Sequence, residues 1–229
     1  MTTPPAIAPD PLATLTPPMR WLLERSTPDE PALAQISPTA TLDSLYSSWM
    51  KSEEFASAIR LIAAVLPPRE SIWWAWVSAR HATQTEGGTA ANTKVHAALT
   101  AVERWVVQPD DAARRSAWDT GNAAGLDTPI GMVSAAVFLS GTTVAPAHVP
   151  PVPPPPGVTM PLIAGAITLA AASITPPEQV QVTMAAFAAQ GLEIIKRLNG
   201  WDAALHLAHE SQQRQQIEYD RVTNAPFGG

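Results

Sequence analysis

Several residue types are missing or scarce in this sequence, and their absence excludes whole classes of functional site. None of the 229 residues is a cysteine, and only 15% of them carry a charge. Without cysteine, disulfide scaffolds, cysteine-ligated zinc, iron–sulfur clusters and thiol catalysis are excluded. The longest apolar run, residues 158–174, is interrupted by Pro161 and three hydroxyl side chains. A membrane span needs about 20 strongly apolar residues, so we expect a buried helix there and no membrane segment.

Positive charge is also scarce, and the formal net charge is −6. Nucleic-acid-binding proteins normally present a basic face, and electrostatic attachment to anionic lipid needs clustered Lys and Arg. We therefore expect neither nucleic acid nor a membrane surface as a partner. The first basic residue is Arg20, and prolines interrupt every apolar stretch before it. This pattern is unlike a secretory signal, and we expect a cytoplasmic protein.

The sequence contains no HExxH, no P-loop, no GxGxxG and no GxSxG elbow. His206 and His209 share a helix face, but a zinc site needs two further convergent ligands. The acidic pairs at 53–54 and 110–111 fall in predicted first helical turns, where acids have a structural role. We predict no catalytic residue, no cofactor and no metal, and hence a protein that is not an enzyme.

Proline is abundant, with 24 residues, and it is unevenly distributed. Residues 1–40 are rich in proline and threonine, which predicts a flexible N-terminal segment. Residues 41–200 contain apolar stripes at helical spacing and are expected to form one domain. Residues 201–229 are predicted to be a polar helix followed by a frayed tail.

Helical periodicity predicts about seven or eight helices between residues 41 and 200. Thr41, Ser52 and Thr128 are expected N-caps, and Asn199-Gly200 is an expected left-handed helix end. Short helices separated by prolines favour an irregular or orthogonal bundle, so the predicted fold is all-α, single and compact, with a proline-rich internal linker at 141–157. The expected helices cover residues 41–50, 52–66, 68–82, 90–107, 109–125, 130–140, 160–174 and 175–198.

Three of the eight tryptophans, Trp73, Trp74 and Trp76, lie within one helical turn. Trp73 and Trp76 can share a face, whereas Trp74 lies about 100° around the helix, so one narrow contact cannot bury all three. Either the helix is surrounded, which is the more common outcome for large residues, or one ring faces a partner. Just before them, Arg69 is placed to stack on a ring, and Glu70 suits the helix N-terminus.

The proline-rich linker contains two PxxP patterns, Pro150/Pro153 and Pro151/Pro154. Such segments dock in SH3- or WW-like grooves. Here the run joins two apolar helices inside the expected domain, which favours a stiff spacer packed across the surface. Both interpretations stay open at this stage.

Three stretches together resemble a known family: LPPRESIWWAW at 66–76, AVERWVVQPDDAARRSAW at 101–118 and AVFLSGTTVAPAHVPPVPPPPG at 136–157. In this order they are similar to an uncharacterised family of small helical bacterial proteins, with LPPRE-x-x-WWA as its most specific part. Members are often encoded near type VI secretion genes, including those of spike-tip proteins and their loading partners. The resemblance implies an accessory role in secretion and brings no catalytic residues.

These observations lead to three functional hypotheses. The first is a non-enzymatic adaptor or chaperone for an effector or spike component, which binds through a groove between the tryptophan helix and the proline segment. Its candidate partner-binding residues are Arg69, Glu70, Trp73, Trp74, Trp76, Pro150, Pro151, Pro153 and Pro154. The second is a small-molecule-binding or enzymatic site near Arg69, Glu70, Trp74 and His81, of which the last three are spaced for one helix face. The third is a structural subunit of a larger assembly.

Overall fold

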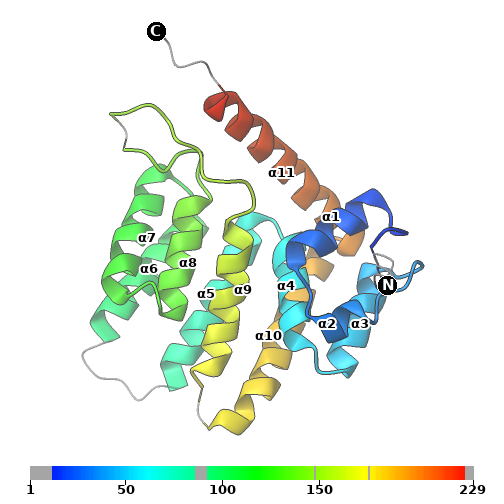
Figure 1. Ribbon diagram of the computed structural model, residues 1–229. Helices are drawn as coiled ribbons and strands as arrows, with labels where there is room; N and C mark the ends of the chain where they lie inside the picture. The colour runs from blue at the N-terminus through cyan, green and yellow to red at the C-terminus, as the bar shows by residue number, and fades with distance from the viewer. Residues whose placement is uncertain (1–11, 86–91, 147, 175, 225–229) are drawn as a thin grey trace, which may run out of the picture.

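The computed structural model describes residues 12–85, 92–146, 148–174 and 176–224 (Figure 1). Throughout these ranges the regular secondary structure is helical, which confirms the all-α prediction. The sequence predicts a break between the helices at 68–82 and 90–107, and most of this break lies outside the described residues. The helices are α1 (Pro17–Ser26), α2 (Glu30–Leu33), α3 (Leu42–Lys51), α4 (Phe55–Val65), α5 (Pro68–Thr85), α6 (Asn92–Val107), α7 (Asp111–Ala124), α8 (Pro129–Leu139), α9 (Thr159–Ala172), the short 3-10 helix η1 (Pro177–Gln179), α10 (Val180–Arg197) and α11 (Trp201–Thr223).

The eight helices α3 to α10 correspond to the eight predicted ones, mostly with ends within a few residues. Local capping chemistry explains much of this agreement. Thr41 accepts a hydrogen bond from the backbone of Ser44 at 3.1 Å, and Thr128 caps α8 in the same way. Asn199, with φ 67°, ends α10 in the left-handed conformation. The predicted cap Ser52 is wrong, because this residue instead ends α3 and α4 begins at Phe55.

The helices form two groups on either side of a central set (Figure 1). Helices α6, α7 and α8 pack together at one side, and α1, α2 and α3 lie at the other. Between them α4, α5, α9 and α10 build the main core. Helix α4 is buried almost all round, because α1, α3, α9, α10 and α11 all pack on it.

The N-terminal region differs from the flexible segment expected over residues 1–40. Residues 17–33 contain α1 and α2, and α1 packs on α4 through Leu22 and Leu23, both fully buried. The indole of Trp49 donates to the carbonyl of Ala32 at 3.0 Å and ties α2 to α3. Proline content misled the prediction, because Pro17 stands at the start of α1, where a missing N–H costs nothing. Residues 1–11 lie outside the described part.

Helix α11 is the longest helix of the described chain, at 23 residues. Its first half packs on α4 and α1 and buries Ala204 and Ala208. Its second half runs away from the bundle (Figure 1). No helix in the described ranges combines the length and apolar character needed to cross a lipid bilayer.

Candidate functional site

The tryptophan helix α5 divides its three indoles between the core and the surface. Trp74 is only 1% exposed, and its Nε1 donates to the carbonyl of Phe187 on α10 at 2.9 Å. Trp76 is also buried, and its Nε1 donates to the carbonyl of Leu99 on α6 at 2.9 Å. Trp73 is 38% exposed, and its indole N–H bonds no residue that the structure describes. The helix is therefore surrounded on two sides and presents one ring.

This arrangement corrects the expected role of Trp74 as a partner contact. Its ring fills the contact between α5 and α10, where a Cβ on Gly191 would lie 2.8 Å from Trp74 Cζ2. Trp76 is held in the same structural manner by α6. Of the three rings, only Trp73 retains the surface position that binding to another protein requires.

The second predicted cluster does not assemble around an open cavity. Trp74 and His81 do share a helix face, as their spacing predicted, but that face packs on Phe187, whose ring lies 5.8 Å from the His81 ring. Arg69 does not stack on an indole; its guanidinium donates to the last carbonyls of α6, 2.8 Å to Val106 and 3.2 Å to Val107. Glu70 lies in the first turn of α5, where an acid suits the helix dipole.

The proline segment folds back on itself and is tied to α7. Val144 N–H donates to the Val152 carbonyl at 2.8 Å, and the Val152 N–H donates to the Thr143 hydroxyl at 2.8 Å. In each PxxP pattern the second proline is covered: Pro153 is buried and Pro154 half-buried, while Pro150 and Pro151 are exposed. A groove-binding PxxP ligand needs both prolines accessible, so these positions favour the spacer interpretation.

Arg114 on α7 anchors the beginning of this segment. The side chain is 4% exposed, and its guanidinium donates to the carbonyls of Phe138 and Thr143 and to the carboxylate of Asp111. Its Cζ lies 4.9 Å from the centre of the Phe138 ring. Neighbouring Arg115 adds a bond to the carbonyl of Ala145 at 2.7 Å. The first half of the proline segment is thus held by fully engaged cations.

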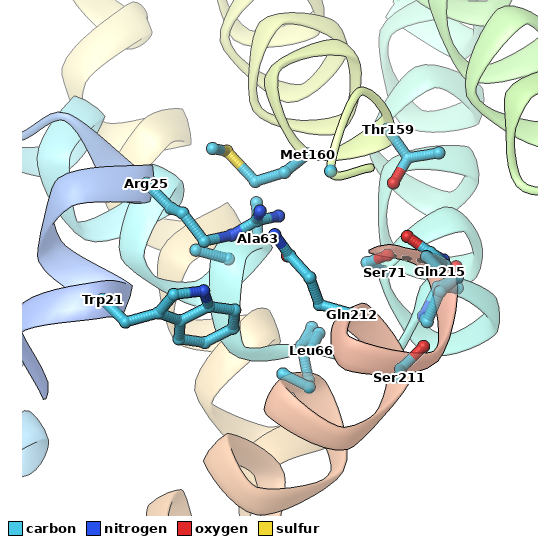
Figure 2. Close-up of a pocket in the computed structure, with 14 residues that line it drawn as sticks. Trp21, Arg25, Ala63, Leu66, Ser71, Thr159, Met160, Ser211, Gln212 and Gln215 are labelled. Atoms are coloured by element: carbon cyan, nitrogen blue, oxygen red, sulfur yellow. Dashed lines mark hydrogen bonds between the residues drawn. The ribbon is translucent and has the colours of Figure 1, made fainter. Parts of the chain in front are cut away.

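The end of the proline segment meets a different arginine, Arg25 of α1, in a pocket (Figure 2). The pocket is open to solvent, and the empty space between its lining residues, open solvent included, is about 400 Å³. Five segments surround it: α1, α4, the loop into α5, the start of α9 and the middle of α11. Its lining residues are Trp21, Arg25, Ala63, Ala64, Leu66, Pro68, Ser71, Gly157, Thr159, Met160, Ala208, Ser211, Gln212 and Gln215.

Arg25 carries the pocket's only charge among these residues. Its Cζ lies 5.1 Å from the centre of the Trp21 ring, and the His209 ring makes an edge-type contact with the same indole, with ring centres 5.1 Å apart. No hydrogen bond or ion pair joins its guanidinium to a described residue, and its Nε is buried. Burial lowers the pKa of Arg25 below its ordinary value, with no carboxylate contributing.

The pocket could not be found from sequence spacing, because its walls come from segments that are far apart in the chain. The expectation of a flexible N-terminus also removed Trp21 and Arg25 from consideration. One local signal was present: Gly157 directly follows the proline run and takes a φ of 78°. A glycine in that place often marks a turn or a close approach of another group.

These features define an all-α protein whose described residues contain no group of three His, Asp or Glu side chains able to hold a metal ion. The chain belongs to a family of unknown function (DUF6931), whose model matches residues 45–195. No curated protein and no solved structure matches the chain. The matched range contains the tryptophan helix, the Arg114 anchor and one wall of the pocket. Helices α1 and α11, which supply the opposite wall with Arg25, lie outside it.

Proposed function

We propose that this protein is a non-enzymatic interaction module, an adaptor or chaperone-like accessory protein of a bacterial type VI secretion system. Its partner would be a secreted effector or a spike component. The observation that carries the proposal is the exposed indole of Trp73 beside two fully engaged ones. Tryptophan is among the residues most enriched at binding hot spots, because it combines a large apolar area with one hydrogen-bond donor.

The surface around Trp73 has further features of a contact site. Arg69 lies one turn earlier on the same face of α5, and Val107, 73% exposed, follows at the end of α6. The bonds from Arg69 to the carbonyls of Val106 and Val107 hold its long side chain at the end of α6. Because the cation is already held in place, a partner that covers this surface loses little side-chain entropy. We call Arg69, Trp73 and Val107 the indole patch.

Two considerations support an interaction role over catalysis. Of the four residues predicted for an alternative site, Arg69 and Trp74 donate to backbone carbonyls and His81 packs on a ring of a neighbouring helix. The resemblance in the stretches 66–76, 101–118 and 136–157 connects the sequence to proteins encoded near secretion genes, and the indole patch lies on the first two of these stretches.

The test is affinity purification of the tagged protein from its native host under secretion-inducing conditions, with mass spectrometry of what co-elutes. We expect a stoichiometric effector or spike protein with the wild type and its loss with Trp73→Ala. Val182→Ala is the matched control, because Val182 is 70% exposed on α10, outside the patch. Trp74→Ala is unsuitable, since removing this buried ring is expected to cost about 3–5 kcal/mol of stability.

Either of two results would reject the proposal. One is recovery of the wild-type protein without a stoichiometric partner. The other is a partner that Trp73→Ala retains as well as Val182→Ala does, with circular dichroism showing both variants folded. Self-association of the purified protein in light scattering would instead favour the structural-subunit hypothesis.

A further inference from the structure

The guanidinium of Arg25 is placed in a way that is costly without a ligand. Two other arginines in the described chain, Arg20 and Arg60, also have a buried Nε without a bond, yet each pairs with a carboxylate. Arg20 lies 3.4 Å from Glu24, and Arg60 lies 2.5 Å from Asp29. Among the described residues, Arg25 contacts the Trp21 ring and lies in the last turn of α1, without a carboxylate partner. A partly desolvated cation without a hydrogen-bonded partner favours the binding of an anion, which would compensate its charge.

The rest of the pocket lining offers neutral hydrogen-bonding groups and no acid. Thr159, Ser211, Gln212 and Gln215 belong to it, and none of their side chains bonds another described residue. Figure 2 shows Arg25 and Gln212 reaching into the same space from α1 and α11. An anion there would find amide and hydroxyl donors next to the guanidinium, with no carboxylate to repel it.

The backbone favours negative charge at the same place. Helix α5 begins at Pro68 and α9 begins at Thr159, and both residues line the pocket. The N-terminus of α9 has no side-chain cap and no acidic residue in its first turn. The positive end of the α9 dipole therefore adds to the charge of Arg25, whereas Glu70 offsets the dipole of α5.

Gly157 explains how the arginine comes so near the start of α9. A Cβ at this position would collide with the Nη1 and Nη2 atoms of Arg25, and its φ of 78° is one that other residues rarely adopt. The glycine thus permits the turn and the close approach together. Without it, the guanidinium would be pushed out of the pocket.

The surroundings select the kind of anion. A single cation with no second positive side chain in the lining suits a monoanion better than a phosphate dianion, and the net charge of −6 disfavours polyanions. Ala63, Ala64 and Leu66 close the pocket on the α4 side and are each no more than 5% exposed, so little apolar surface is open to a ligand. We propose that the Arg25 pocket binds a carboxylate that carries a short, slender chain, with the carboxylate on Arg25. This chemistry is shared by small aliphatic acids and by the C-terminus of an apolar peptide.

The proposal is independent of the indole patch, and purified full-length protein is sufficient to test it. Isothermal titration calorimetry would compare sodium hexanoate with neutral hexanamide, which has the same chain without the charge. We expect hexanoate to bind and hexanamide to bind at least about tenfold more weakly, as the loss of a charge-assisted contact implies. Equal affinity for the two compounds, or no heat with hexanoate, would overturn the proposal.

A second pair of probes identifies the source of the carboxylate. A tetrapeptide that ends in leucine would be titrated with a free C-terminus and with an amidated one. Tighter binding of the free peptide than of hexanoate assigns the pocket to peptide termini. Tighter binding of hexanoate assigns it to small acids, and both results keep the carboxylate proposal.

The variants locate the site. Arg25→Gln is expected to abolish discrimination between hexanoate and hexanamide, and Gln212→Ala is expected to weaken hexanoate binding several-fold. Arg80→Gln is the matched control, because Arg80 also lies over an indole, 5.3 Å from the Trp76 ring, outside the pocket. If Arg25→Gln binds hexanoate as wild type does, the assignment is wrong. Should Arg25→Gln fail to fold, Gln212→Ala against Arg80→Gln decides the question in its place.

Discussion

Each end of the proline segment lies next to an arginine. The two arginines have similar neighbours, an aromatic ring and a glycine, but they differ in how many hydrogen bonds their guanidinium groups make. Arg114 and Arg25 each lie about 5 Å from an aromatic ring, at 4.9 and 5.1 Å. Each also approaches a glycine so closely that a Cβ there would collide with it. Arg114 is bonded to two carbonyls and a carboxylate, whereas Arg25 has no bonded partner in the described chain.

The comparison distinguishes a structural cation from a candidate ligand-binding cation in the same molecule. Burial alone does not separate them, because Arg114 is the more buried of the two. The two arginines differ in whether their N–H groups have acceptors, because a buried charge is stable when its donors are hydrogen-bonded. We call the Arg114 end of the proline segment the closed end and the Arg25 end the open end. The closed end stabilises the fold, whereas the open end has hydrogen-bond donors left for a ligand.

The largest effect is expected at the closed end. Arg114→Met leaves the carbonyls of Phe138 and Thr143 without their donor, and each unsatisfied group costs about 1–3 kcal/mol. We expect the free energy of unfolding in urea to fall by about 2–5 kcal/mol. Arg221→Met is the control, because Arg221 pairs only with exposed Glu218 and should leave the unfolding curve unchanged. Similar curves for the two variants would show that the anchor is not structural.

The two glycines provide a smaller and sharper comparison. A Cβ at Gly141 would lie 2.5 Å from the Nε of Arg114, which cannot move without losing its bonds, so Gly141→Ala should cost about 1–3 kcal/mol. At Gly157 the arginine is free to yield, and the cost comes from the positive φ, about 1–2 kcal/mol.

Double variants distinguish these two causes. Combined with Arg114→Met, the Gly141→Ala penalty should largely disappear, because the colliding side chain is gone. Combined with Arg25→Met, the Gly157→Ala penalty should persist, because it lies in the backbone. Urea unfolding of the four single and two double variants is the measurement, and the reverse pattern would contradict this account of the two ends.

The closed end also predicts a response to acid that the open end lacks. Hydrogen bonds from Arg115, and next from Arg114, lower the pKa of Asp111 below its usual 3.8. A lowered folded-state pKa means that this stabilisation is present above the unfolded value and is lost as the pH falls through the folded one. Asp111→Asn should therefore lower the free energy of unfolding at neutral pH. Under acid conditions the variant and the wild type should differ less in this quantity. A constant difference across this pH range would contradict the prediction.

The sequence predicted the parts of this molecule that depend on local chemistry. Helix number and most helix ends followed from caps such as Thr41 and Thr128 and from the apolar stripe of α4, which short-range physics determines. The prediction of a flexible N-terminal segment was wrong for residues 17–33, because whether α1 orders depends on Leu22 and Leu23 meeting α4, a tertiary contact without a local signal. Proline content described the unfolded preference of this region and not its packing.

The candidate sites show the same division. That one of the three α5 indoles faces outwards was one of the alternatives from helical geometry, yet which one does so depends on where α6 and α10 lie. The Arg25 pocket joins α1 to α11 across most of the chain, and its defining feature is a missing partner. An unmatched donor cannot be recognised in a sequence, because every arginine there looks equally free.

The smallest effect on stability is expected at Arg25. This result decides whether Arg25 differs from Arg114 in its contribution to the fold. Arg25→Met removes a cation–π contact with Trp21, worth about 0.5–1 kcal/mol. It also removes a partly desolvated charge with no matched acceptor, and this gain offsets the loss. We expect the free energy of unfolding to change by less than about 1 kcal/mol, with Arg80→Met, which loses a similar contact over Trp76 at the surface, as control. A loss as large as that of Arg114→Met would mean that Arg25 is a second structural anchor, and the contrast between the two ends would fail.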